Sequence, residues 1–197
     1  FSKDGRKIAY HYSASSNDSN ISISNPNGSD FIILLKTRIP DVKIQWPSED
    51  KISFYNLNEP SDLFSLNIGN SELTKLAGPL YNFSVLWSPD GKSVIYSGSN
   101  SPDGDIKLFW HNPSEETYVD LELNALASAC AWSVDSNTIF CSDESGFWKI
   151  DIKNKNRENI YQNTGYLAKD LILPPLENYL IFKNKKDGFL YSLPIKN

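Results

Sequence analysis

Methionine is absent from this sequence of 197 residues, and cysteine and histidine occur only twice each. Two cysteines are too few for a disulfide framework, and the two histidines, His11 and His111, lack the close spacing of zinc ligands. Long hydrophobic runs are missing as well. The run from Phe31 to Leu35 is strand-length, far short of the roughly 20 apolar residues that span a membrane. These absences argue against a zinc domain and against a membrane-spanning helix within the sequence.

Motifs of catalysis are missing too. The sequence has no Gly-x-Ser-x-Gly elbow, no His-Glu-x-x-His pair and no glycine-rich phosphate loop. A Ser-His-Asp triad would need one of the two histidines, and each lies in a strand pattern without a suitable neighbour. The acidic pairs Glu115-Glu116 and Asp143-Glu144 fall in predicted loops, where solvated charges are expected. We therefore predict that the protein is not an enzyme and has no catalytic, cofactor-binding or metal-binding residue.

Basic residues are outnumbered by acidic ones. The net charge is −5, from 19 lysines and arginines against 24 aspartates and glutamates, and both signs are interspersed. A surface that binds nucleic acid needs a basic stripe. The one basic cluster, Lys153 to Arg157, is interrupted by asparagines and predicts a solvated turn. We therefore expect no nucleic-acid partner.

A hairpin signal is repeated along the sequence, and Trp87–Tyr96 is its clearest copy. Asp90-Gly91 predicts a tight turn, because glycine tolerates positive φ and the Asp side chain can bond its own backbone. Strand side chains alternate, so Trp87, Val94 and Tyr96 fall on one side of the hairpin.

Five copies of this signal occur, 41 to 45 residues apart. That period is typical of a β-propeller with four-stranded blades, and no segment keeps the apolar spacing of a helix. We predict an all-β fold, a β-propeller of four-stranded antiparallel blades with about five blades in one domain, 1–197. The anchor residues of the copies are Phe1, Trp46, Trp87, Trp132 and Leu173. The predicted blades are 1–40, 41–79, 80–125, 126–165 and 166–197.

The repeated pattern resembles the repeat of TolB-type propellers. It consists of tryptophan or a substitute, then Ser-Pro-Asp-Gly-Lys, then an apolar-x-aromatic strand. Trp87–Tyr96 matches the whole pattern, and Phe1–Tyr10 matches with lysine in the proline position. Trp132–Cys141 and Leu173–Phe182 keep the pattern but depart from it in the turn. The resemblance implies six or more blades, so we expect the chain to be part of a larger propeller.

The resemblance also implies a location. Bacterial envelope proteins in which a membrane-anchored N-terminal segment precedes such a propeller are similar in layout. We therefore expect an extracytoplasmic protein of the cell envelope that contacts a membrane only through an upstream anchor. The sequence begins with Phe1, and any signal peptide or anchor is expected upstream of it.

Structural roles are expected for the most distinctive residues. Asp4-Gly5 and Asp90-Gly91 are interpreted as turn chemistry. Trp46, Trp87 and Trp132 are interpreted as the core between blades rather than as a sugar-stacking surface.

Cys130 and Cys141 fall on neighbouring strands of one hairpin, roughly opposite each other. Three interpretations remain open, namely buried free thiols, a cross-strand disulfide and a metal site. An oxidising compartment would favour the disulfide.

Binding is expected at the loops between the second and third strands of each blade, because loops on a rigid scaffold usually carry function. We predict a protein-interaction or ligand-binding module whose partner, an unknown protein or small ligand, binds this loop face. The alternatives are the gating propeller of a prolyl-oligopeptidase-like hydrolase and a carbohydrate-binding propeller. The predicted loops are Ser13–Ser19, Asn56–Ser61, Ser97–Gly104, Ser142–Ser145 and Lys183–Gly188.

Overall fold

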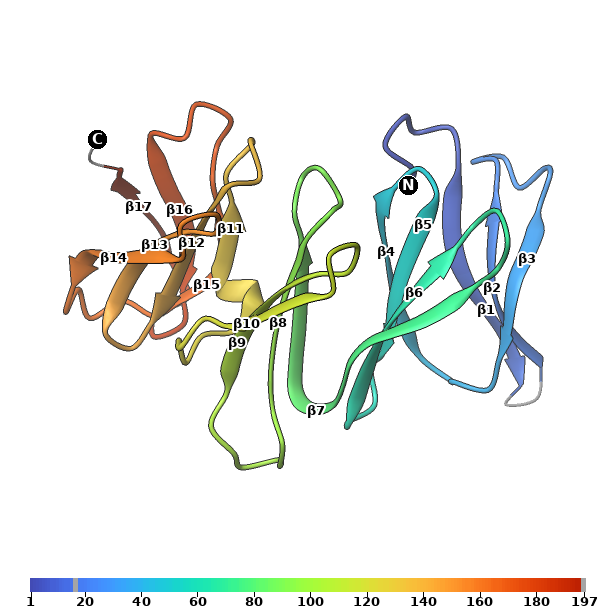
Figure 1. Cartoon of the computed structure of the whole chain (residues 1–197), viewed down its shortest axis with the longest axis horizontal. Helices are drawn as coiled ribbons and strands as arrows, with labels where there is room; N and C mark the ends of the chain where they lie inside the picture. The colour runs from blue at the N-terminus through green and yellow to red at the C-terminus, as the bar shows by residue number, and fades with distance from the viewer. Residues whose placement is uncertain (16–17, 196–197) are drawn as a thin grey trace. The chain divides into compact units, whose positions relative to one another are not determined.

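The computed structural model describes residues 1–15 and 18–195 (Figure 1). The chain forms two compact units, Phe1–Tyr81 and Asn82–Asn197. Antiparallel strands dominate both units, and the helical content of the described residues is one short 3-10 turn, η1 (Ala127–Ala129). The predicted all-β class is therefore confirmed.

The first unit contains two antiparallel groups of strands. The strand order is β1-β2-β3 in one group and β4-β5-β6 followed by the first part of β7 in the other. The strands are β1 (Ile8–Ser15), β2 (Asp18–Ser24), β3 (Ile32–Thr37), β4 (Val42–Ser48), β5 (Lys51–Asn56), β6 (Ser61–Asn67) and β7 (Leu73–Trp87).

The core of the first unit lies between these two groups. Ile21, Ile23 and Leu34 from β2 and β3 are buried in one cluster with residues of β5 and β6. Alternation places these apolar side chains on one face of each strand. Trp46 from β4 packs against the same cluster and is half-buried.

The second unit contains three groups of strands, in the orders β7-β8-β9-β10, β11-β12-β13-β14 and β15-β16-β17. The strands after β7 are β8 (Val94–Ser99), β9 (Lys107–Asn112), β10 (Thr117–Asp120), β11 (Cys130–Trp132), β12 (Thr138–Asp143), β13 (Gly146–Asp151), β14 (Asn156–Gln162), β15 (Ala168–Ile172), β16 (Tyr179–Asn184) and β17 (Leu190–Pro194).

Both faces of the four-stranded sheet β11–β14 are buried. Cys130 and Trp132 point to one side, into a cluster with Ile95 and Leu108 of β8 and β9. Ala131 lies between them in sequence and belongs to a second cluster, with residues of β15 and β16. Alternate residues of one strand therefore pack against different sheets, as in stacked propeller blades.

One strand differs from the expected blade boundaries. The predicted boundary between the second and third blades falls after residue 79, yet β7 is continuous from Leu73 to Trp87. Its first part stays paired to β6 as far as Leu80, which lies opposite Ser61. The register between the two strands shifts twice along this pairing, on either side of Leu63. A bulge leaves the extra residue unpaired and disrupts the ladder only locally, so pairing resumes beyond it.

The hairpin turns share a bond that is independent of glycine. A serine hydroxyl donates to an aspartate carboxylate two residues later in four of the five repeats, at distances of 2.6–2.7 Å. In the fourth repeat, Ser136 takes the place of glycine and adopts the left-handed conformation at φ 62°. The Ser-x-Asp bond therefore holds the turn where the Asp-Gly signal is lost. The pairs are Ser2–Asp4, Ser48–Asp50, Ser88–Asp90 and Ser133–Asp135.

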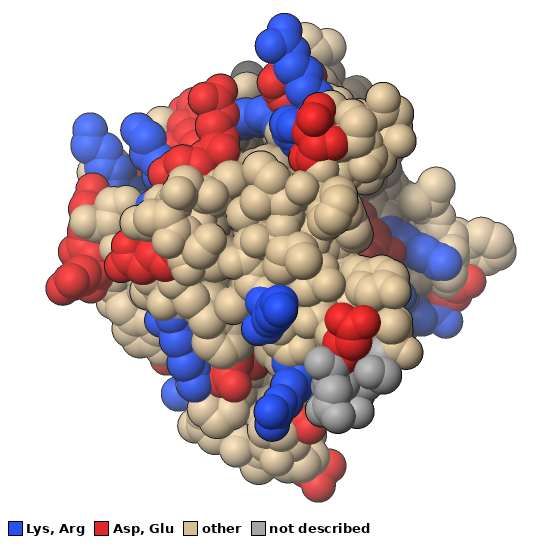
Figure 2. All heavy atoms as spheres, turned by 90° about the vertical axis from the view of Figure 1, so that its right-hand side faces the viewer, with Lys and Arg blue, Asp and Glu red and all other residues tan. Residues whose placement is uncertain are grey.

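The β1–β3 sheet leaves an apolar face uncovered in the first unit. Tyr12, Phe31 and Ile33 are 50%, 63% and 44% exposed, and Figure 2, which looks onto this side, shows a largely uncharged centre. Ile8 and Tyr10, the first residues of this face after the hairpin turn, are half-buried. Their counterparts in the other repeats are at most 3% exposed, namely Ile52, Phe54, Val94, Tyr96, Ile139, Cys141, Leu180 and Phe182.

Candidate functional site

The loops of the second unit surround a hollowed surface. One hollow of about 440 Å³ is lined by residues that precede β9, residues that precede η1 and the loop between β12 and β13. A second hollow of about 180 Å³ adjoins it and reaches β15 and Lys185. Four residues line both hollows, so the two form one surface, here called the loop surface. The shared residues are Ile106, Asn124, Asp143 and Glu144.

Three of the predicted loops contribute to the loop surface. They are represented by Gly104, by Ser142 with its neighbours in the β12–β13 loop, and by Lys185. Residues 16 and 17 of the predicted loop Ser13–Ser19 lie outside the described residues. The loop Asn56–Ser61 belongs to the first unit.

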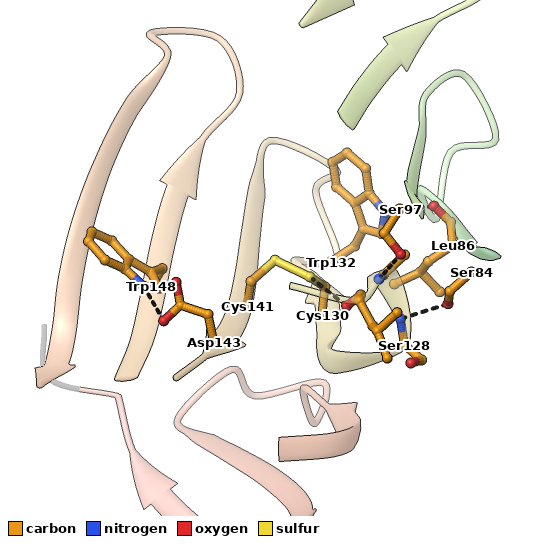
Figure 3. Close-up of a disulfide and its surroundings, with 11 residues drawn as sticks. Ser84, Leu86, Ser97, Ser128, Cys130, Trp132, Cys141, Asp143 and Trp148 are labelled. Atoms are coloured by element: carbon orange, nitrogen blue, oxygen red, sulfur yellow. Dashed lines mark hydrogen bonds between the residues drawn. A yellow bond between two sulfur atoms is a disulfide. The ribbon is translucent and has the colours of Figure 1, made fainter. Parts of the chain in front are cut away.

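Asp143 is held rigidly at the centre of the loop surface. Its Oδ1 accepts hydrogen bonds from the amide and hydroxyl of Ser145, at 2.9 and 2.6 Å. It also accepts one from Trp148 Nε1 at 3.0 Å (Figure 3). Arg157 lies on the neighbouring strand β14, and its guanidinium is 5.4 Å from the centre of the Trp148 ring. A carboxylate with several donors is strongly oriented, so Asp143 organises the β12–β13 loop.

The other carboxylates of the loop surface are unengaged. Asp105 and Glu144 line the hollows, and neither is hydrogen-bonded to or ion-paired with another residue in the described part of the chain. Lys185 is the cation that lines the same surface. The loop surface is therefore net acidic, with carboxylates free to bind a positively charged group.

Serine side chains connect the loop surface to the sheets behind it. Ser97 Oγ accepts a hydrogen bond from the Ala127 amide at 2.9 Å, and Ser84 Oγ accepts one from the Ser128 amide at 3.0 Å (Figure 3). Ser142 Oγ accepts from the Ala168 amide at 3.4 Å, linking the next pair of sheets. The bonds to the Ala127 and Ala168 amides satisfy buried donors, and the three bonds together fix the base of the loop surface.

Cys130 and Cys141 form a disulfide beneath this surface (Figure 3). They are directly paired across β11 and β12, and both are buried, 2% and 0% exposed. Of the three interpretations left open by the sequence, the structure contains the cross-strand disulfide.

The three tryptophans expected in the core differ in burial. Trp132 is 7% exposed, and its Nε1 donates to the Leu86 carbonyl at 3.4 Å. Trp46 and Trp87 are half-buried. Trp110 is 8% exposed and belongs to the core cluster of Trp132.

The expected turn residues occupy hairpin turns in both units. Gly5 and Gly91 adopt positive φ, 71° and 73°, and their amides bond the carbonyls of Ser2 and Ser88. The sequence pattern includes the serine three residues before each glycine, but it did not predict the bond from the serine hydroxyl to the aspartate. The recurrence of serine two residues before an aspartate is the sequence signal for this bond.

The turn aspartates are stabilised as anions. The pKa of Asp135 lies below its usual range because the Ser133 hydroxyl and the side chain and amide of Asn137 donate to it. Partial burial pushes the pKa of Asp90 upward, but hydrogen bonds from Ser88 and the Lys92 amide outweigh burial, and this pKa is also lowered. The acid form of these residues therefore disfavours the folded turn.

One histidine has a serine neighbour that the sequence did not indicate. His11 Nε2 and Ser19 Oγ are 2.6 Å apart, and Ser19 Oγ also donates to the Ile39 carbonyl at 3.4 Å. Ser19 is 4% exposed, and across residues 1–15 and 18–195 no carboxylate bonds His11 as the third member of a triad. The pair joins β1 and β2 to the chain that follows β3. Clusters of three or more metal-binding side chains are not found in the described ranges.

Searches of sequence and structure gave different results. No family model matches the chain, and no curated protein matches it in sequence. None of the described helical segments is long and apolar enough to cross a membrane.

Solved structures resemble the chain closely in fold. An oligogalacturonate lyase in complex with manganese is 13% identical, with a TM-score of 0.64 over 91% of this chain and 55% of its own. TolB from Acinetobacter baumannii is 15% identical, with a TM-score of 0.57 over 97% of this chain and 53% of its own. The Cps50 (Swd1) β-propeller domain from Myceliophteria thermophila is 11% identical, with a TM-score of 0.63 over 100% of this chain and 64% of its own.

The chain thus spans between about half and two thirds of the length of these structures. Identities of this size establish fold and not function. The sequence period, the alternating burial of β11 and the structural similarity agree with one another. The chain has a β-propeller fold.

Proposed function

We propose that this chain is a non-catalytic binding module of the bacterial cell envelope, and that its loop surface binds a partner through positively charged groups. The observation that carries the proposal is the convergence of loops from three sheets around adjoining hollows with unengaged carboxylates. Rigid scaffolds commonly present binding residues on such loops. The oriented Asp143 and the free Asp105 and Glu144 supply a local negative potential that attracts cations.

Two observations support the extracytoplasmic location. A buried disulfide is typical of an oxidising compartment. The hairpin repeat resembles that of TolB-type propellers, and TolB from Acinetobacter baumannii is among the similar structures.

The proposal is tested with a lysine-rich peptide as the probe, titrated into the whole chain by calorimetry at low and at physiological salt. We expect binding that weakens as salt rises, because exposed charge pairs are screened. Replacing Asp105→Asn and Glu144→Gln together should weaken it about fivefold, since each exposed pair contributes ~0.5 kcal/mol. The matched control is Glu115→Gln with Glu116→Gln, which removes two exposed acids outside the loop surface.

Equal losses in the two double variants would show non-specific charge attraction and would reject the loop surface. If a neutral oligosaccharide binds the chain and the lysine-rich peptide does not, the carbohydrate-binding alternative is favoured instead. Galacturonate oligomers carry carboxylates, so the acidic loop surface should repel them.

A further inference from the structure

A third hollow of the second unit lies apart from the loop surface and shares no residue with it. It has a volume of about 250 Å³, roughly the space of eight waters in the liquid. Its floor is apolar and its rim is charged, which is the usual construction of a small-molecule site. The floor is formed by Trp110, Val119, Leu121, Ile150 and Ile152, and the rim by Asp120, Glu122, Asp151, Lys155 and Arg157.

Trp110 lines this hollow and carries a donor without a partner among the described residues. The side chain is 8% exposed, and its Nε1 is buried without a hydrogen-bond acceptor among the described residues. Burial of such a group without a partner is costly, and native proteins usually satisfy it with protein, water or ligand. A ligand that carries an acceptor would remove this cost.

The carboxylates of the rim are already engaged. Glu122 pairs with Arg157 at 3.3 Å, and its carbonyl accepts from Arg157 Nη1 at 2.8 Å. Asp120 pairs with Lys107 at 3.7 Å. Asp151 accepts hydrogen bonds from Asn154 at 2.9 Å.

The Lys155 ammonium is different. In the described part of the chain it has no carboxylate within ion-pair distance and no hydrogen-bond acceptor. Two donors around the hollow are therefore without a protein partner among the described residues, the buried Trp110 indole and the exposed Lys155 ammonium. They complement an acceptor with negative charge.

We propose that this hollow binds a carboxylate attached to an apolar group about the size of a phenylalanine side chain. The apolar group lies against Val119, Ile150 and Ile152, and the carboxylate lies toward Lys155 and the Trp110 indole. Two sources share this chemistry, a free acid and the C-terminal residue of a peptide. Either binds at a surface distinct from the one assigned to the proposed function.

The probes are 3-phenylpropionate, its neutral amide, and a short peptide that ends in phenylalanine with a free or an amidated C-terminus. The readout is the indole N–H resonance of Trp110 in a ¹H–¹⁵N spectrum of the folded chain, assigned with Trp110→Phe. We expect the acid to move this resonance and the amide to move it far less. A tighter free-ended peptide would identify the C-terminus as the source, and a tighter free acid would identify a small molecule.

Variants separate the cation from the apolar floor. Lys155→Met should weaken binding of the acid about twofold and leave binding of the amide unchanged. The matched control is Lys153→Met, which removes an exposed ammonium from the same turn but outside the hollow. Val119→Phe fills the hollow and should abolish the shift, and its spectrum also reports whether the chain remains folded.

A Trp110 resonance that stays fixed with every carboxylate at millimolar concentration would overturn the proposal, because the donor would then be satisfied by water. Equal effects of the two lysine variants would overturn the role of Lys155. Neither result bears on peptide binding at the loop surface, so failure here and failure of the proposed function are distinguishable.

Discussion

Reduction of the Cys130–Cys141 disulfide should lower the free energy of unfolding. The size of the decrease depends on the number of residues between the two cysteines. The two residues are 11 apart in sequence. The entropy of closing such a loop in the unfolded chain corresponds to about 2.8 kcal/mol at 25 °C. With a urea slope of about 2 kcal/mol/M, the unfolding midpoint should fall by about 1.4 M.

The assay compares urea unfolding of the oxidised protein with that of protein unfolded, reduced and refolded with reductant present. Reductant added to the native protein should act slowly, because both sulfurs are buried. The matched control, Cys130→Ala with Cys141→Ala, removes the bond and should show one midpoint with or without reductant. If the oxidised protein yields two free thiols when unfolded, or if reduction leaves the midpoint unchanged, the reasoning is refuted.

Three further predictions concern the sheets and turns. Gly146→Ala should lower the free energy of unfolding by about 3 kcal/mol, because φ is 142° and a Cβ would lie 1.9 Å from the Tyr161 carbonyl oxygen. Gly165→Ala, where the space around the residue is open, should lower it by about 1 kcal/mol. Equal falls in melting temperature for the two variants would contradict this. The turn aspartates have folded pKa values below 3.8, so their stabilisation is complete above that pH and is lost as pH falls through the folded values; a urea midpoint that does not fall between pH 5 and pH 3 would be inconsistent with it. Tyr12→Lys with Ile33→Lys should reduce concentration-dependent self-association in sedimentation while leaving the melting temperature unchanged, since both side chains are exposed.

The sequence predicted the hairpins well, because their signals are local. Tryptophan, a turn and alternating apolar residues fall within about ten residues of one another, as in Trp87–Tyr96. Strand alternation also predicted that Cys130 and Cys141 lie opposite each other, and the structure pairs them. It could not choose between thiol and disulfide, because that choice depends on the redox environment.

Features that depend on distant partners were not predictable. β7 continues past the blade boundary predicted after residue 79, because β6 supplies a ladder for it as far as Leu80. Trp110 is buried because residues of a different sheet cover it. The loops were predicted in position, but their acidic hollows follow from how three sheets are stacked.

The fold of the second unit depends on sheets that pack face to face, and the contact between Phe147 and Phe182 tests this most directly. Their ring centres are 4.9 Å apart, although they belong to different sheets. A nuclear Overhauser spectrum of the folded chain, with the two rings selectively labelled, should show strong cross-peaks between them. The absence of those cross-peaks in a spectrum with dispersed, native-like resonances would contradict the stacked arrangement.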